Sequence, residues 1–397
     1  MRRLACASLL FLVACSQQVP REAPPTSISP TAPSAATSVA AAPTLLPAGT
    51  QTQVVFNFPG GRLLFSAYQG EEGRQTDPAV VEAFAGFAYY PWFEEHFWLD
   101  FEDRTVDAHP MLTGLYPTQD RVLAMSPDLS QIAYERVVYT QPTQASGAVH
   151  LSATDGGEST QVGQRFDGDY VLGASWSLDG RVFAYWMGQD WQAFAHEGSH
   201  QIYVSEVDSG PARAVTIQAM QPTTAALSPD GTQIAFSTLG EAQGMYLINA
   251  DGSDQQLLVE GAIDWIGWHP DGRRILFAAF SPETGIQSYD IGNGAVTSIS
   301  PPGKRARDPR ISPDGSLIAY DSNGIYVVSA DGGDALQLTG GGTRDWIWSP
   351  NSRYLAYSDI PSNGASLVFV MDTLGNGRVA VSPNTLSAAQ LIGWLPQ

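Results

Sequence analysis

Short apolar segments alternate with turn-forming residues along most of the chain, and their order recurs. A typical unit begins with an apolar segment such as 264–268, passes through a Ser-Pro-Asp-Gly turn, and resumes with a second apolar segment such as 233–236. A third segment alternates β-branched and aromatic residues, as in 325–328, and an Asp-Gly turn leads to a short fourth segment. Period-two alternation between such turns predicts β-strands rather than helices.

The central turn of this unit recurs seven times. Proline presets φ, aspartate bonds its own backbone and glycine accepts positive φ, so each copy predicts a tight turn between two strands. Successive copies begin 37 to 68 residues apart, and a period of this size indicates a propeller or a solenoid. The copies are Phe58-Pro59-Gly60-Gly61, Ser126-Pro127-Asp128, Ser177-Leu178-Asp179-Gly180, Ser228-Pro229-Asp230-Gly231, His269-Pro270-Asp271-Gly272, Ser312-Pro313-Asp314-Gly315 and Ser349-Pro350-Asn351.

Four antiparallel strands per repeat make a propeller blade, so we predict an all-β fold, a β-propeller over residues 51–397. We expect seven blades, with six and eight as alternatives. Residues 391–396 resemble an inner strand of a further repeat, which would close the ring against the first blade unless residues 54–58 already fill that place. Small residues in the second strands predict close packing of neighbouring blades. They are Ala133, Ala184, Ala235, Ala319 and Ala356.

The fullest copy, SPDGSLIAYDSNGIYVVSADGGDALQLT at 312–339, resembles the repeat of TolB-type propellers. The resemblance extends over residues 51–397 and implies a propeller. That family includes partner-binding proteins, peptidase propellers and lyases, so the resemblance specifies the fold more narrowly than the function. TolB itself has an α/β domain before its propeller. A spacer stands in that place here, which puts a TolB role in envelope assembly in doubt.

The amino terminus predicts export and lipid attachment. Residues 1–14 combine two arginines with an apolar stretch too short to cross a bilayer, as in a signal peptide. The run ends at Cys15 in a sequence that resembles the bacterial lipobox, which implies that Cys15 carries the lipid. Residues 15–50 are rich in Pro, Ala, Ser and Thr and predict a disordered tether. We expect a protein on the secreted side, lipid-anchored to the outer face of the cytoplasmic membrane or to the outer membrane.

The formal net charge of −20 limits the partners that we expect. An acidic surface repels phosphate backbones and anionic headgroups, so we expect no nucleic acid and no membrane contact beyond the lipid anchor. Proteins, peptides and glycans of the cell envelope are compatible partners. The excess of acids is also what a secreted protein uses to remain soluble.

The motifs of the chain favour a non-enzyme. Residues 196–200 (HEGSH) match the zinc-protease pattern, but Gly198 and Ser199 disfavour the helix that this motif needs. The chain has neither a Gly-x-Ser-x-Gly elbow nor a phosphate-binding loop. We therefore expect no catalytic residue, no metal ion and no cofactor.

A set of charged residues precedes the inner strands. In a propeller the loops before these strands converge on one mouth of the channel, so the pattern predicts a rim that binds a charged or polar ligand. The alternative is that each aspartate caps its own turn and pairs with a neighbouring arginine. The candidates are Asp120, Asp169, Asp264, Asp308, Asp345, Arg307, Arg310 and Arg344.

The longest gap between repeats, residues 69–95, holds six aromatic residues between Phe84 and Phe93. An insertion of this composition forms either a lid or partner-binding patch, or a short helix that covers the first blade with its own small core. Together these features predict an envelope lipoprotein whose propeller binds a protein, peptide or glycan. One alternative is a metal-dependent polysaccharide lyase similar to oligogalacturonate lyases, and another is a scaffold in an envelope complex.

Overall fold

The computed structural model describes the propeller portion of the chain. The described residues are 60–68, 94–112, 118–141, 144–164, 169–189, 201–207, 209–216, 221–238, 243–281, 284–301, 306–341, 343–359, 367–382 and 388–396. These residues form strands and turns, and none of them is helical.

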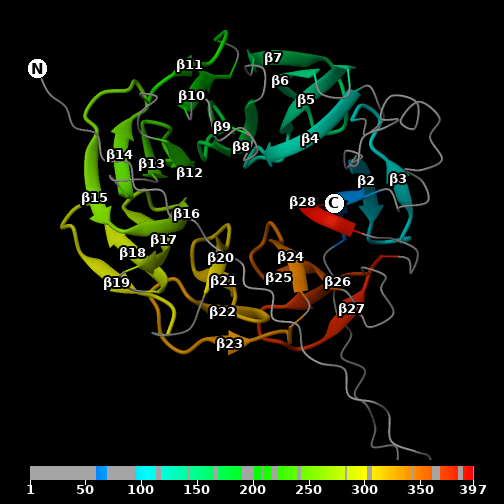
Figure 1. Ribbon diagram of the computed structural model, residues 1–397. Helices are drawn as coiled ribbons and strands as arrows, with labels where there is room; N and C mark the ends of the chain where they lie inside the picture. Colours follow the sequence, from blue (N-terminus) through cyan, green and yellow to red (C-terminus); the bar gives the residue numbers. More distant parts are fainter. Residues whose placement is uncertain are drawn as a thin grey trace, which may run out of the picture. The chain divides into compact units, whose positions relative to one another are not determined.

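Seven four-stranded antiparallel sheets are arranged around a central axis (Figure 1). The fold is therefore all-β with seven blades, as the repeat predicts. From the channel outward, blade 1 consists of β28 (Ala388–Leu395), β1 (Arg62–Tyr68), β2 (Glu94–Asp100) and β3 (Val106–Ala108). Blade 2 consists of β4 (Thr118–Met125), β5 (Gln131–Gln141), β6 (Gln144–Ala153) and β7 (Ser159–Gln164). Blade 3 consists of β8 (Asp169–Trp176), β9 (Val182–Gln189), β10 (Gln201–Glu206) and β11 (Arg213–Ala214).

The remaining four blades follow the same order. Blade 4 consists of β12 (Pro222–Leu227), β13 (Gln233–Thr238), β14 (Gly244–Asn249) and β15 (Gln256–Glu260). Blade 5 consists of β16 (Ala262–Trp268), β17 (Arg274–Ser281), β18 (Gly285–Asp290) and β19 (Val296–Ser298). Blade 6 consists of β20 (Arg307–Ile311), β21 (Leu317–Asp321), β22 (Ile325–Ser329) and β23 (Leu336–Gln337). Blade 7 consists of β24 (Thr343–Trp348), β25 (Tyr354–Asp359), β26 (Leu367–Asp372) and β27 (Arg378–Ala380).

The carboxy-terminal strand closes the ring. Strand β28 pairs with β1 from Arg62 opposite Leu395 to Ala67 opposite Ala388, and it takes the inner place of blade 1. The segment after the seventh blade is thus part of the first blade and not the beginning of an eighth. Residues 54–58, the alternative occupant of this place, lie outside the described residues.

The hydrophobic core lies between neighbouring blades. Seven buried clusters occur, one for each pair of adjacent blades, including the pair formed by blades 7 and 1. The alanines of the second strands are buried to within 1% of zero exposure, which confirms the predicted close approach of the sheets. In six blades a ring on the second strand stacks on a ring of the third strand at 5.1 to 5.6 Å.

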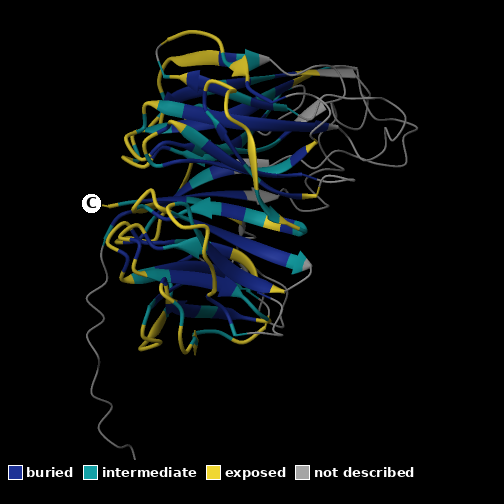
Figure 2. Ribbon diagram, turned by 90° about the vertical axis from the view of Figure 1, so that its left-hand side faces the viewer, coloured by how far each residue is buried: buried dark blue, intermediate teal, exposed yellow. Residues whose placement is uncertain are grey.

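The inner strands all run in one direction, so the two ends of the channel differ. The turns that follow the inner strands gather at one end, which we call the turn face (126–129, 177–180, 228–231, 269–272, 312–315 and 349–352). The first residues of the inner strands lie at the opposite end, which we call the entry face. Figure 2 shows exposed turns collected on one side of the blades.

Candidate functional site: the central channel

One hydrogen-bond arrangement shapes the turn face. The hydroxyl of Ser126 donates to Asp128 at 2.6 Å and accepts the backbone N–H of Gln131 at 2.9 Å, and four other blades repeat this pattern. The serine hydrogen bond holds the pKa of Asp128 below its usual range. Because these bonds involve only neighbouring residues, each turn forms locally and holds the residue after its serine, proline in four of the five, in a fixed place.

A β-bulge interrupts each inner strand. At each bulge the pairing with the second strand skips a residue, and an unpaired bulge residue has its side chain re-aimed relative to the sheet. The skipped residues are charged in blades 5, 6 and 7 and uncharged in blades 1 to 4, so the charged bulge residues lie in three adjacent blades. From blade 1 to blade 7 they are Ala389 and Ile392, Leu123, Leu172, Thr223, Asp264, Asp308 with Pro309, and Arg344.

Of the predicted acids whose side chains the structure describes, Asp264 and Asp308 remain exposed. They come from adjacent blades, and neither forms a hydrogen bond or ion pair with another described side chain. Asp308 has a positive φ of 46°, which is uncommon outside glycine. The protein walls partly desolvate the Asp308 carboxyl and raise its pKa. The nearby carboxylates Asp264 and Asp321 add to this rise, and the charge of Arg310 opposes it.

Asp120 and Asp345 are instead held within the wall of the ring. The carboxylate of Asp120 is fully buried and accepts two hydrogen bonds from Arg136, at 2.7 and 2.8 Å. The carboxylate of Asp345 accepts Nη2 of Arg310 and the backbone N–H of Leu391, both at 2.6 Å. Arg310 belongs to blade 6 and Leu391 to blade 1, so Asp345 joins three blades.

Arginines of the inner strands make further links. Arg121 forms an ion pair with Glu135 at 2.9 Å and donates to the backbone carbonyl of Val171 in the next blade. Arg307 lies 3.8 Å from Asp321 within its own blade. These contacts match the alternative in which the charged residues pair with one another.

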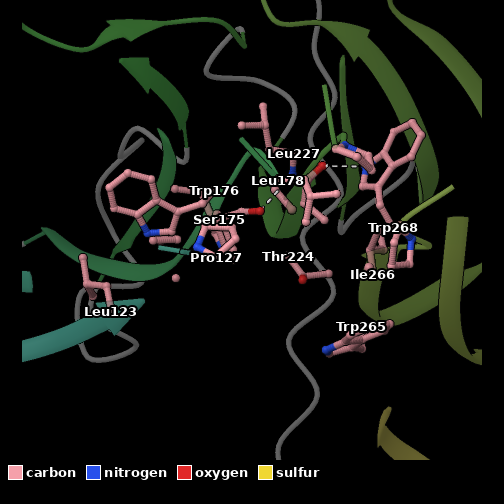
Figure 3. A pocket seen from close by; sticks show the side chains of 18 residues that line it. Leu123, Pro127, Ser175, Trp176, Leu178, Thr224, Leu227, Trp265, Ile266 and Trp268 are labelled. Carbon is pink, nitrogen blue, oxygen red and sulfur yellow. Dashed lines mark hydrogen bonds between the residues drawn. The ribbon is translucent and has the colours of Figure 1, made fainter. Parts of the chain in front are cut away.

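The turn face surrounds two hollows that share Pro127, Leu178, Trp268 and Pro270, and the second of them is the more apolar. The first, of about 460 Å³, extends along the inner strands of blades 2 to 5. Figure 3 shows its side chains, which include Trp176, Ile266 and Trp268 at the wall. The second hollow, of about 430 Å³, lies against blades 1, 2, 6 and 7 and is lined by Trp348 and Trp394 among other residues.

Several tryptophans of these hollows are fixed by hydrogen bonds. The indole N–H of Trp268 donates to the carbonyl of Ala226 at 2.9 Å, and that of Trp348 donates to the carbonyl of Arg310 at 2.9 Å. Both bonds cross from one blade to its neighbour. The two indole rings are therefore held in place. Leu178 stands at the turn position where the other blades have proline, and this residue is 54% exposed.

For the other predicted residues and segments, the structure describes the backbone alone or does not describe them. Asp169 and Arg344 lie in β8 and β24, where the backbone alone is described. Cys15, the motif at 196–200 and nearly all of the insertion at 69–95 lie outside the described residues. Within the described ranges, no group of three or more His, Cys, Asp or Glu residues is arranged to hold a metal ion. The same ranges contain no helix long and apolar enough to span a membrane.

Sequence reasoning missed the hollows, although their signal was present. Tryptophan recurs at the end of the inner strands, as Trp176, Trp268 and Trp348, directly before the turns of the repeat. Each residue type was explained by its local role in a strand or a turn. That the prolines and tryptophans of different blades meet around one axis follows only from the closed ring.

Fold and channel define a closed, seven-bladed β-propeller. Residues 128–394 match the TolB beta propeller domain model, and the chain belongs to this family. No curated protein matches the chain.

Solved structures are similar to the chain at low sequence identity, and those with TM-scores above 0.5 share its fold. TolB from Acinetobacter baumannii is 17% identical over 77% of this chain and 80% of its own, with a TM-score of 0.47. An oligogalacturonate lyase from Vibrio parahaemolyticus is 12% identical over 80% of this chain and 91% of its own, with a TM-score of 0.54. The propeller of the Trilobed protease from Pyrococcus furiosus is 8% identical over 83% and 96%, with a TM-score of 0.56.

Proposed function

We propose that this protein is an envelope lipoprotein that binds an apolar peptide segment of a partner protein at the turn face of its channel. The observation that carries the proposal is the pair of hollows joined at Pro127, Leu178, Trp268 and Pro270. Their volumes of about 460 and 430 Å³ fall within the usual range of ligand sites. An exposed apolar opening on an acidic protein is a surface that gains free energy when a partner covers it.

The lining favours an apolar peptide over a glycan. Glycans present many hydroxyls, which need polar side chains for recognition. The serine hydroxyls at this mouth already have protein partners: Ser175 accepts the backbone N–H of Leu227, and Ser312 bonds Asp314 and the backbone of Leu317. Tryptophan, proline and leucine side chains dominate the remainder, and such groups anchor apolar and proline-rich segments of protein partners.

The anchor part of the proposal rests on the sequence around Cys15. Two acyl chains hold a protein stably on a membrane, and residues 16–50 would allow the propeller to reach partners above the surface.

A peptide library displayed on phage and selected against the full chain tests the binding site. Leu178→Glu places a charge at the entrance without removing a hydrogen bond, because only the backbone N–H of Leu178 is bonded, to Pro229 at 2.8 Å. We expect selected peptides to be apolar and to lose at least tenfold in affinity for this variant. Leu374→Glu is the matched control, since Leu374 is 72% exposed in the turn between β26 and β27 and does not line either hollow. Equal binding to both variants would refute the proposed site. If the selected peptides are basic and their binding requires Asp264 and Asp308, the binding site lies at the entry face instead.

A further inference from the structure

Three of the six histidines in the chain meet at the joint between blades 1 and 2. His96 lies on β2, His109 follows β3, and His150 lies on β6. All three are within electrostatic reach of the buried carboxylate of Asp120. Among the described residues, four buried polar atoms at this joint have no hydrogen-bond partner: Oγ of Ser66, both ring nitrogens of His96 and Nδ1 of His150.

His96 occupies a position that is aliphatic in every other blade. It pairs across the strands with Ser66 and is 2% exposed. The equivalent residues of blades 2 to 7 are Val149, Ile202, Met245, Ile286, Ile325 and Val368. Burial lowers the pKa of His96 to about 4, with the charge of His109 adding to the effect and that of Asp120 opposing it. An aliphatic residue would fill this place without any such cost, so the imidazole is not required for packing.

His109 makes its full set of hydrogen bonds only in its neutral form. Its Nε2 lies 3.0 Å from the carbonyl oxygen of Thr154 in blade 2, and its Nδ1 accepts the backbone N–H groups of Met111 and Leu112 at 3.3 and 3.2 Å. This pattern assigns the proton to Nε2. Protonation of Nδ1 would convert an acceptor of two hydrogen bonds into a donor that faces two donors.

His150 stacks on Tyr134 with 5.4 Å between the ring centroids, at the place where Phe97, Tyr246 and Phe369 stack in other blades. Burial lowers the pKa of His150, and the charge of Arg136 adds to the effect. Tyr134 packs in the same buried cluster as Leu64 and Trp98 of blade 1.

The acidic and basic groups at the joint already balance one another, so a protonated histidine would find little negative charge to stabilise it. The carboxylate of Asp120 is matched by the guanidinium of Arg136, which lies 5.2 Å from the ring centre of Tyr134. From blade 1, the guanidinium of Arg62 lies 4.7 Å from the ring centre of Trp98 and repels a charged His109. Asp155 is the other acid that acts on His109, and the remaining described groups that act on the three imidazoles are those already named.

We propose that the joint between blades 1 and 2 is a pH-sensitive contact, which loosens at mildly acidic pH as His96, His109 and His150 take up protons. Below the pKa of a free histidine the unfolded or opened joint binds protons that the closed joint does not accept, so acidification favours opening. The strands that would loosen include β1 and β2, and the segment 69–93 connects these two strands in the sequence.

The test is the pH dependence of hydrogen exchange in the full chain, corrected for the intrinsic rate at each pH. We expect peptides from β1, β2, β4 and β6 to lose protection between pH 7 and pH 5, while peptides from blade 5 keep it. For His96 alone, a folded pKa of about 4 against the ordinary value of 6.5 corresponds to an opening constant that rises about 20-fold over this range.

Substitutions by residue types that occur at the equivalent positions of other blades test which histidines cause the pH response. His96→Met and His150→Phe introduce the residue types found at the equivalent places in Met245 and Phe97, and we expect the double variant to lose most of the pH response. His269→Ser is the matched control, because it removes a histidine from a turn of blade 5 where five other blades have serine. It should retain the full response at the joint.

Two results would overturn the proposal. One is a wild-type joint whose protection is equal at pH 7 and pH 5. The other is a response that persists unchanged in His96→Met and in His150→Phe. If the double variant does not fold, the single variants and an NMR titration of the wild type test the proposal instead. The titration follows the ring protons of His96, His109 and His150, and three ordinary pKa values near 6.5 would contradict the buried joint.

Discussion

Asp345 and Asp264 lie in the inner strands of blades 7 and 5, and their replacement by alanine is expected to have very different effects. Asp345→Ala removes the acceptor for both Arg310 and the backbone N–H of Leu391. Because the Arg310 side chain is 37% exposed, solvent recovers part of the lost ion pair, and we assign about 1–2 kcal/mol to it. A buried N–H left without an acceptor costs a further 1–3 kcal/mol, roughly. The expected loss in free energy of unfolding is about 3 kcal/mol.

Asp264→Ala is the matched control, since Asp264 is exposed and forms no hydrogen bond with another described residue. Surface replacements of this kind usually change stability by less than about 0.5 kcal/mol. Urea denaturation followed by tryptophan fluorescence measures both variants, and Asp345→Asn should fall between them because its amide keeps one acceptor oxygen. If Asp345→Ala and Asp264→Ala agree within about 1 kcal/mol, the three-blade contact at Asp345 does not stabilise the ring as we infer.

The remaining predictions concern one glycine and the lipid anchor. Gly324→Ala should lower the thermal midpoint clearly more than Gly180→Ala. Both glycines have positive φ, at 133° and 69°, but an added Cβ at Gly324 would lie 2.3 Å from the carbonyl oxygen of Thr339, whereas none lies within 4 Å at Gly180. Scanning calorimetry compares them, and equal midpoints would contradict the steric argument. Cys15→Ser should release the protein from the membrane fraction into the soluble secreted fraction, and unchanged membrane association would refute lipid attachment at Cys15.

Features that depend on adjacent residues could be predicted from the sequence. The Ser-Pro-Asp-Gly turns, the alternating strands and the buried alanines such as Ala235 and Ala319 are determined within a few positions of each other, and the structure confirms them. Ring closure was harder, because residues 54–58 and 391–396 are both short apolar segments. Only the pairing of β28 with β1 distinguishes them among the described residues.

The environments of the candidate functional residues could not be predicted from the sequence, for a physical reason. Asp120 and Asp264 look alike in the sequence, yet Asp120 meets Arg136 from the adjacent strand, while Asp264 projects from a bulge. Nothing local to either aspartate indicates which environment it has. The histidine joint was missed for the same reason, since His96, His109 and His150 are distant in sequence and meet only when blades 1 and 2 pack together.

The pairing of β28 with β1 also bears on how the chain reaches its native state. The two strands lie at opposite ends of the described sequence, so this contact has a very large sequence separation and must form late. Until β28 is available, β1 has an unprotected edge capable of pairing with other chains. Folding therefore depends on holding six finished blades and one incomplete blade apart from similar molecules until β28 pairs with β1.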